Sequence, residues 1–167
     1  MDQTNNFLSE FEEKEKTGNL KTLTVLTFIG CGLALFGAVY GFATADSSYD
    51  KMQEAINNGS VDKLPGFVKD MYSPERMEMM KKMGENKIPI LIINLIATGL
   101  CLVGAIQMRR LKADGYWMWL IGEILPYLAM GFFLGAASVT GVFMYISYAI
   151  VAVFIILYSM QRKYLKK

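Results

Sequence analysis

The chain has 167 residues, of which 53% are hydrophobic and 19% charged, and its formal net charge is +2. So small a net charge does not indicate nucleic-acid binding. The absence of histidine removes the commonest general base and the commonest transition-metal ligand. We therefore expect no enzymatic activity, no cofactor and no nucleic-acid partner.

The apolar residues gather in long stretches that are almost free of charge, which is typical of a membrane protein. The last stretch, 116–160, is too long for one crossing, because a transmembrane helix needs about 20 residues. The predicted elements, in chain order, are a tail (1–20), a first span (21–44), a long outer loop (45–87), a second span (88–108), a basic inner loop (109–115), a third span (116–137), a fourth span with its preceding turn (138–160) and a basic tail (161–167).

Each span is expected to be helical, because lipid offers no hydrogen-bond partner to an unpaired backbone N–H. The predicted fold class is all-α, an antiparallel four-helix transmembrane bundle with a small helical cap formed by the long first outer loop. In that loop, Ser73, Pro74 and Glu75 form a good helix start, and Tyr49 to Asn57 has the pattern of a short amphipathic helix.

Small residues recur at helical spacing in the spans, where they let helix backbones approach closely. They predict packing within the bundle or a face for a second copy of the chain. These residues are Gly30, Ala34 and Ala38, then Gly37 and Gly41, then Ala97, Cys101 and Ala105, and finally Gly131 and Gly135. Both cysteines, Cys31 and Cys101, are interpreted as small apolar side chains.

Glu123 is the single ionisable acid or base well inside a predicted span. A charge at that depth costs about 2.5–3.5 kcal/mol on insertion scales, so the residue is a functional candidate. Pro126 has no N–H and leaves the carbonyl of Gly122 without its helical partner. A free carbonyl beside a carboxyl group is suited to bind a cation or pass a proton. Thr27 is expected at similar depth, together with Thr24 and Tyr158.

The alternative for Glu123 is a hydrogen-bonded residue that fixes helix register. Asn94 lies in the outer half of the second span, and we expect it to form a hydrogen bond between helices. Along the bilayer normal it is expected to lie too far from Glu123 to share a site. Met77, Met80 and Met83 of the outer loop follow helical spacing, which predicts an apolar face, with Cu(I) binding as the alternative.

Lysine and arginine predict the orientation, because they concentrate on the cytoplasmic side. The inner loop carries Arg109, Arg110 and Lys112, and the C-terminal tail is also basic. Both termini are therefore expected in the cytoplasm, with the chain in a plasma or inner membrane. The expected partners are the lipid bilayer and other membrane proteins or a second copy. The expected function is that of a non-enzymatic accessory or scaffold component of a membrane complex. The alternative is a small oligomeric transporter or channel centred on Glu123 and Pro126.

Overall fold

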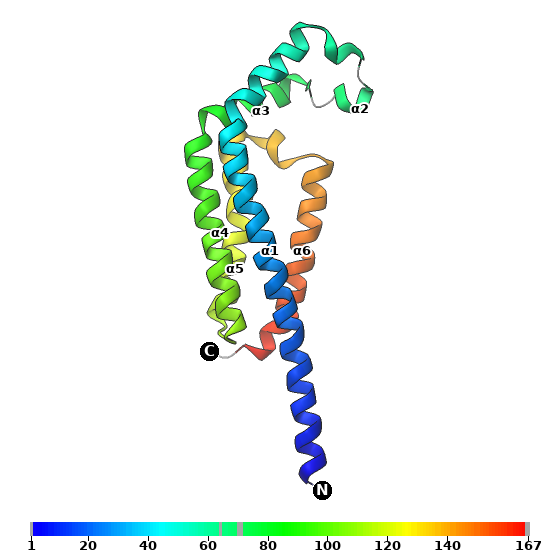
Figure 1. Ribbon diagram of the computed structural model, residues 1–167, viewed down its shortest axis with the longest axis vertical. Coiled ribbons are helices and arrows are strands. Elements are labelled where there is room, and N and C mark those ends of the chain that lie inside the picture. The colour runs from blue at the N-terminus through cyan, green and yellow to red at the C-terminus, as the bar shows by residue number, and fades with distance from the viewer. Residues whose placement is uncertain (1, 64, 70–71, 166–167) are drawn as a thin grey trace.

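The computed structural model describes residues 2–63, 65–69 and 72–165, and these form helices joined by short turns (Figure 1). The elements are α1 (Asp2–Asn57), η1 (Ser60–Lys63), α2 (Gly66–Lys69), α3 (Pro74–Glu85), α4 (Lys87–Arg109), α5 (Asp114–Leu134), η3 (Ala136–Val139), α6 (Val142–Gln161) and η4 (Arg162–Tyr164). Within the described residues, four helical segments are long and apolar enough to cross a membrane: Gly18–Asn57, Lys87–Arg109, Asp114–Leu134 and Met144–Tyr164. The predicted all-α, four-helix transmembrane bundle is confirmed.

Helix α1 is longer than the span predicted within it. Its 56 residues include the expected tail, the span at 21–44 and the segment Tyr49–Asn57, which we expected as a separate short helix. The first proline of the chain is Pro65, so no residue in this stretch breaks the backbone ladder. The helix ends at Asn57, two residues before Gly59, which has a φ of 69°. At about 1.5 Å per residue α1 is about 84 Å long, well beyond the ~40–45 Å of a whole bilayer.

The two ends of the bundle differ in what they carry. The turn between α4 and α5, the last turn of α6 and η4 lie at one end, which we call the basic end. Its described cations are Arg109, Arg110, Lys112, Arg162 and Lys163; Lys166 and Lys167 lie outside the described residues. The α5–α6 turn lies at the opposite end, together with η1, α2 and α3, and we call this the cap end. The first part of α1 projects past the basic end, away from the bundle (Figure 1).

The cap is held on the bundle by α3. This helix begins with Ser73 at its N-cap and Pro74 in its first turn, as the sequence predicts. It packs against α1, α5 and η3, so it bridges the first helix and the α5–α6 turn. Lys87, at the start of α4, forms an ion pair with Asp46 of α1 directly below the cap.

The α4–α5 pair is the most closely packed part of the bundle, and glycine makes this possible. A Cβ atom added at Gly104 would lie 2.5 Å from the backbone nitrogen of Trp119, and one at Gly115 would lie 2.6 Å from the carbonyl oxygen of Gly104. A Cβ atom at Gly122 would lie 2.6 Å from the carbonyl oxygen of Ala97. Side chains larger than hydrogen cannot fit at these three positions without moving the two helices apart.

Candidate functional site

A cavity of about 410 Å³ lies among all four spanning helices, in the middle of the bundle. Its volume falls within the range typical of small-ligand sites, about 300–1,000 Å³. Its walls are mostly apolar, with a few polar groups from each helix. The lining residues with polar or sulfur-bearing side chains are Thr27, Cys31, Asn94, Thr98, Cys101, Glu123, Tyr127, Met130, Met144 and Ser147.

Glu123 of α5 is partly buried at this cavity, and its carboxylate is held from α4. The Cys101 Sγ lies 3.3 Å from Glu123 Oε2 and 3.6 Å from the carbonyl oxygen of Trp119, so the thiol has two acceptors within reach. Gly122, which precedes Glu123 directly, and Pro126, about one turn after it, line the same cavity, and Pro126 has no N–H to donate to the Gly122 carbonyl. The predicted combination of a carboxyl group and an unpaired carbonyl is therefore placed at a cavity wall.

The cavity is closed toward the basic end by a layer of hydrogen-bonded and stacked side chains. The Thr27 and Tyr158 hydroxyl oxygens lie 2.7 Å apart, which joins α1 to α6. The rings of Tyr158 and Trp119 lie 4.5 Å apart between centroids, and both residues are almost completely buried. One turn further on, Tyr116 and Ser159 share a hydrogen bond of 2.9 Å. We call Thr27, Trp119 and Tyr158 the floor of the cavity.

Toward the cap end, a second cavity of about 310 Å³ follows the first along α1. The two share Ala34, Asn94 and Met130 as lining residues, so they adjoin. The second cavity extends past Gly37 and Gly41 to Lys87 and the cap residue Met83. The two cavities together extend from Glu123 along α1 to the cap, and the floor lies between Glu123 and the basic end.

Helix α6 packs loosely beside this cavity. Tyr158 is its one buried residue within the part of the helix whose side chains are described. Nearer the cap end, Tyr127 of α5 and Ser147 of α6 share a hydrogen bond of 2.5 Å. Between these two attachment points the rim of the cavity is formed by Leu26 of α1 and Ile150 of α6, which are 46% and 55% exposed. The cavity thus borders the lipid-facing surface between α1 and α6.

The structure places the predicted packing residues in different environments. Ala97, Cys101 and Ala105 are buried on α4, and the first two lie against α5 at Gly122. On α1, a Cβ atom added at Gly30, Gly37 or Gly41 would meet nothing within 4 Å. The glycines and alanines of that helix line the two cavities instead: Gly30 and Ala34 the first, and Ala34, Gly37, Ala38 and Gly41 the second.

Asn94 differs from expectation, and two glycines near the end of α5 have distinct surroundings. Asn94 lines the same cavity as Glu123, so our prediction that it lies too far away to share a site is wrong. Its amide nitrogen donates to the carbonyl of Ile90, 2.9 Å away in its own helix. A Cβ atom added at Gly131 would lie 3.6 Å from the Val139 side chain. Gly135 ends α5 with a φ of 85°, a conformation that favours glycine.

Sequence reasoning missed the sulfur atoms in this cavity. Cys31 of α1 and Cys101 of α4 are both buried, and both belong to one apolar cluster and line this cavity. Met130 and Met144 come from α5 and α6. No spacing in the sequence brings these four residues together, because they belong to four different helices whose rotation is set by packing.

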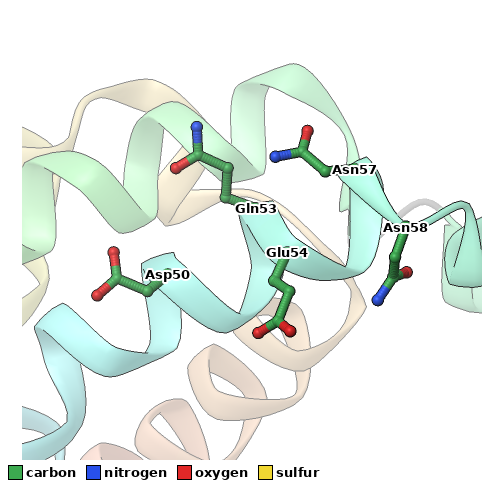
Figure 2. A pocket seen from close by; sticks show the side chains of 5 residues that line it. All are labelled: Asp50, Gln53, Glu54, Asn57 and Asn58. Carbon is green, nitrogen blue, oxygen red and sulfur yellow. The ribbon is translucent and has the colours of Figure 1, made fainter.

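A hollow near the tip of α1 is of a different kind. Figure 2 shows Asp50, Gln53, Glu54 and Asn57 on the last turns of this helix and Asn58 just after its end. All five residues are exposed. Such a polar helix face is hydrated in the cap and gives no indication of a ligand.

The fold and the cavity define a class: a multi-pass α-helical membrane protein with an acidic residue at an intramembrane cavity. Comparison with protein-family models, with curated proteins and with solved structures finds no match for this chain. In the part of the chain that the structure describes, no group of three His, Cys, Asp or Glu residues is arranged to hold a metal ion.

Proposed function

We propose that this protein is a small, non-enzymatic membrane carrier that binds a cation at Glu123. The observation that carries the proposal is the position of Glu123 at a cavity lined by all four spanning helices. A carboxylate in a membrane span is costly, and a bound cation offsets that cost by neutralising it. Intramembrane acids commonly mark ion or substrate pathways for this reason.

Access from one side supports a carrier rather than an open channel. The adjoining cavities lead from Lys87 and Met83 toward Glu123, and the floor closes the other end. Carriers alternate between two such states, each open to one side. The loosely packed α6 is the element best placed to move, because its buried anchor is Tyr158 in the floor.

The first test is cation flux in liposomes. Wild-type protein is expected to move cations across the bilayer, and Glu123→Gln is expected to abolish that flux while keeping shape and hydrogen-bonding capacity. Glu75→Gln, in the exposed first turn of α3, is the matched control and should behave as wild type. Equal flux through wild type and Glu123→Gln would reject the proposal, as would the absence of flux from both.

The second test blocks the route without touching Glu123. Ala34 lines both cavities, and Ala34→Phe fills the space where they adjoin. Leu33→Phe is the control, because Leu33 is an exposed neighbour on the lipid-facing side of α1. Flux is expected to fall at least tenfold in the first variant and to persist in the second. Unchanged flux through Ala34→Phe would place the pathway elsewhere.

We further propose that the basic end faces the cytoplasm of a plasma or inner membrane, in line with the distribution of lysine and arginine. Asn57→Cys in the cap should react with a membrane-impermeant maleimide on intact cells. Arg110→Cys should react after lysis alone. The reverse pattern would invert the proposed topology, and reaction of both in intact cells would exclude it.

An accessory role in a larger complex is the second candidate, and the length of α1 favours it. The helix continues past the basic end of the bundle (Figure 1), where it offers a surface to a partner. Purification of the full chain in mild detergent tests this role. A partner recovered in constant ratio would support it, whereas a chain that always emerges alone would count against it.

A further inference from the structure

The central cavity gathers soft sulfur donors around the acidic residue. Cys31 of α1 and Cys101 of α4 are both buried in one apolar cluster, and they line the same 410 Å³ cavity as Met130 and Met144. We propose that this cavity is a Cu(I) site in which the two cysteine sulfurs are the primary ligands and a methionine thioether is a supplementary one. The inference rests on the proposed function in one respect: Cu(I) would be the cation that the carrier moves.

The donor set selects the cation. Thiolate and thioether sulfur favour Cu(I), whereas Mg²⁺ and Ca²⁺ require six or more oxygen ligands. Among the residues that line the cavity, Glu123 supplies the single carboxylate. A hard divalent ion would therefore lose more hydration than these groups replace. Cu(I) accepts a low coordination number, which two thiols from facing helices can satisfy.

The charges also balance within the bilayer. Cu(I) replaces the proton of the Cys101 thiol and forms a bond to its sulfur, so the thiolate and the metal together are neutral. The proton passes to Glu123 Oε2, 3.3 Å from that sulfur, and the carboxylate becomes a neutral acid. Cys31 then completes the coordination as a neutral thiol. No oxidation or reduction is involved, and no net charge beyond that of the incoming ion is brought into the membrane.

A series of thioethers leads to this site from the cap. Met80 lines a hollow between α1 and α3 that also includes Ala45. Ala45 and Met83 line the second cavity, and Met130 is shared by the second cavity and the first. Weak thioether ligands can pass Cu(I) inward until the Cys101 thiolate binds it more tightly. In this proposal the regularly spaced methionines of the outer loop carry Cu(I) toward the cavity as well as forming an apolar face.

The test is a Cu(I) titration of the full-length protein in detergent under anaerobic, reducing conditions, in competition with a chromogenic Cu(I) chelator. One Cu(I) per chain is expected to resist a large excess of Na⁺ and Mg²⁺. Cys31→Ser and Cys101→Ser should each weaken binding at least tenfold, and the double variant should abolish it. Met130→Leu should weaken binding less, and Met160→Leu, an exposed position on α6, should leave it unchanged. X-ray absorption should show a copper shell of sulfur.

A second measurement uses wild-type protein, so that a variant that fails to fold does not decide the matter. Cu(I) is expected to slow alkylation of both cysteines by a membrane-permeant maleimide at least tenfold. Undiminished binding by the double cysteine variant, unprotected thiols, or a copper shell of oxygen or nitrogen would overturn the inference. So would a stable Cys31–Cys101 disulfide that persists under reduction and excludes copper.

The two proposals fail in different ways. Cu(I) binding at the cysteines without flux in liposomes would uphold the site and reject the carrier. Flux of another cation that depends on Glu123, without Cu(I) binding, would uphold the carrier and reject the copper site.

Discussion

The two sides of the bundle are built on opposite packing principles. Between α4 and α5, glycines bring the backbones so close that no added Cβ atom fits. Between α1 and α6, contact is limited to a few side chains, and a cavity lies between the points of attachment. In lipid, close backbone approach and dispersion replace the hydrophobic effect as the source of helix association. One side is therefore held firmly, and the other is free to rearrange.

The presence of small residues on a helix does not by itself determine whether that helix packs closely against its neighbour. The glycines and alanines of α1 are as regularly spaced as those of α4, yet they line cavities. On α4, Ala97, Cys101 and Gly104 meet Gly115, Trp119 and Gly122 of α5 at matched depth. Close packing thus requires small residues on both partners, whereas three of the four α6 residues that line the cavity are the large Met144, Ile150 and Phe154.

The largest expected effect on stability comes from Gly104→Ala on the tight side. The added Cβ atom would lie 2.5 Å from the Trp119 nitrogen and 2.7 Å from the Gly115 carbonyl oxygen, both backbone atoms that cannot move aside. Overpacking of this kind costs about 1–3 kcal/mol. The measurement is thermal or denaturant unfolding of the protein in detergent micelles.

Gly99→Ala in the same helix is the matched control, because an added Cβ atom there meets nothing within 4 Å. It is expected to keep or raise stability, since alanine is favoured over glycine in helices by up to about 1 kcal/mol. If both variants unfold alike, the α4–α5 contact is not the firmly held side of the molecule.

A smaller effect is expected on the loose side from Tyr158→Phe. The change removes the 2.7 Å hydrogen bond to Thr27 and keeps the ring contact with Trp119. Hydrogen bonds between helices in membranes contribute about 0.6 kcal/mol on average. Tyr145→Phe, at an exposed position on the same helix, should show no change in unfolding.

Tyr158→Phe also tests whether the α1–α6 side of the bundle controls cation passage. If the floor gates the cavity, Tyr158→Phe should clearly raise cation leak across the liposome membrane although it lowers stability only slightly. The reason is that α6 loses one hydrogen bond but keeps its packing. If Tyr158→Phe leaks no more cation than wild type, the hydrogen bond between the two hydroxyl groups attaches α6 but does not close the pathway.

Much of this architecture follows from the sequence because the bilayer imposes it. Hydropathy and length fix the four spans, and the absence of charge makes Glu123 conspicuous. Glu123 and Thr27, expected at similar depth, line one cavity, and Tyr158 is hydrogen-bonded to Thr27. Depth along a helix can be counted in residues, so neighbours at equal depth are predictable.

Rotation about a helix axis is not predictable in the same way. Cys31 and Cys101 were interpreted as small apolar side chains, because nothing in the sequence indicates that they line one cavity. Gly104 and Gly115 were not singled out, because their role depends on the partner helix. Asn94 was placed by depth along a straight helix, whereas a cavity of 410 Å³ spans several turns and includes it.

The smallest expected effect lies outside the membrane, in the cap helix α3. The Lys82 ammonium lies 2.7 Å from the Glu78 carboxylate and lowers the pKa of Glu78 below its ordinary value through a hydrogen bond and charge attraction. A lowered folded-state pKa contributes stability above the unfolded pKa, and this contribution is lost as pH falls through the folded pKa. Both side chains are solvated, so the gain in stability is slight.

In a carboxyl NMR titration the Glu78 midpoint should rise toward its ordinary value in Lys82→Met but not in Lys63→Met, since Lys63 lies in η1, outside α3. An unchanged midpoint in Lys82→Met would show that the pair does not persist in solution and that α3 is held by its packing against α1, α5 and η3 rather than by this ion pair.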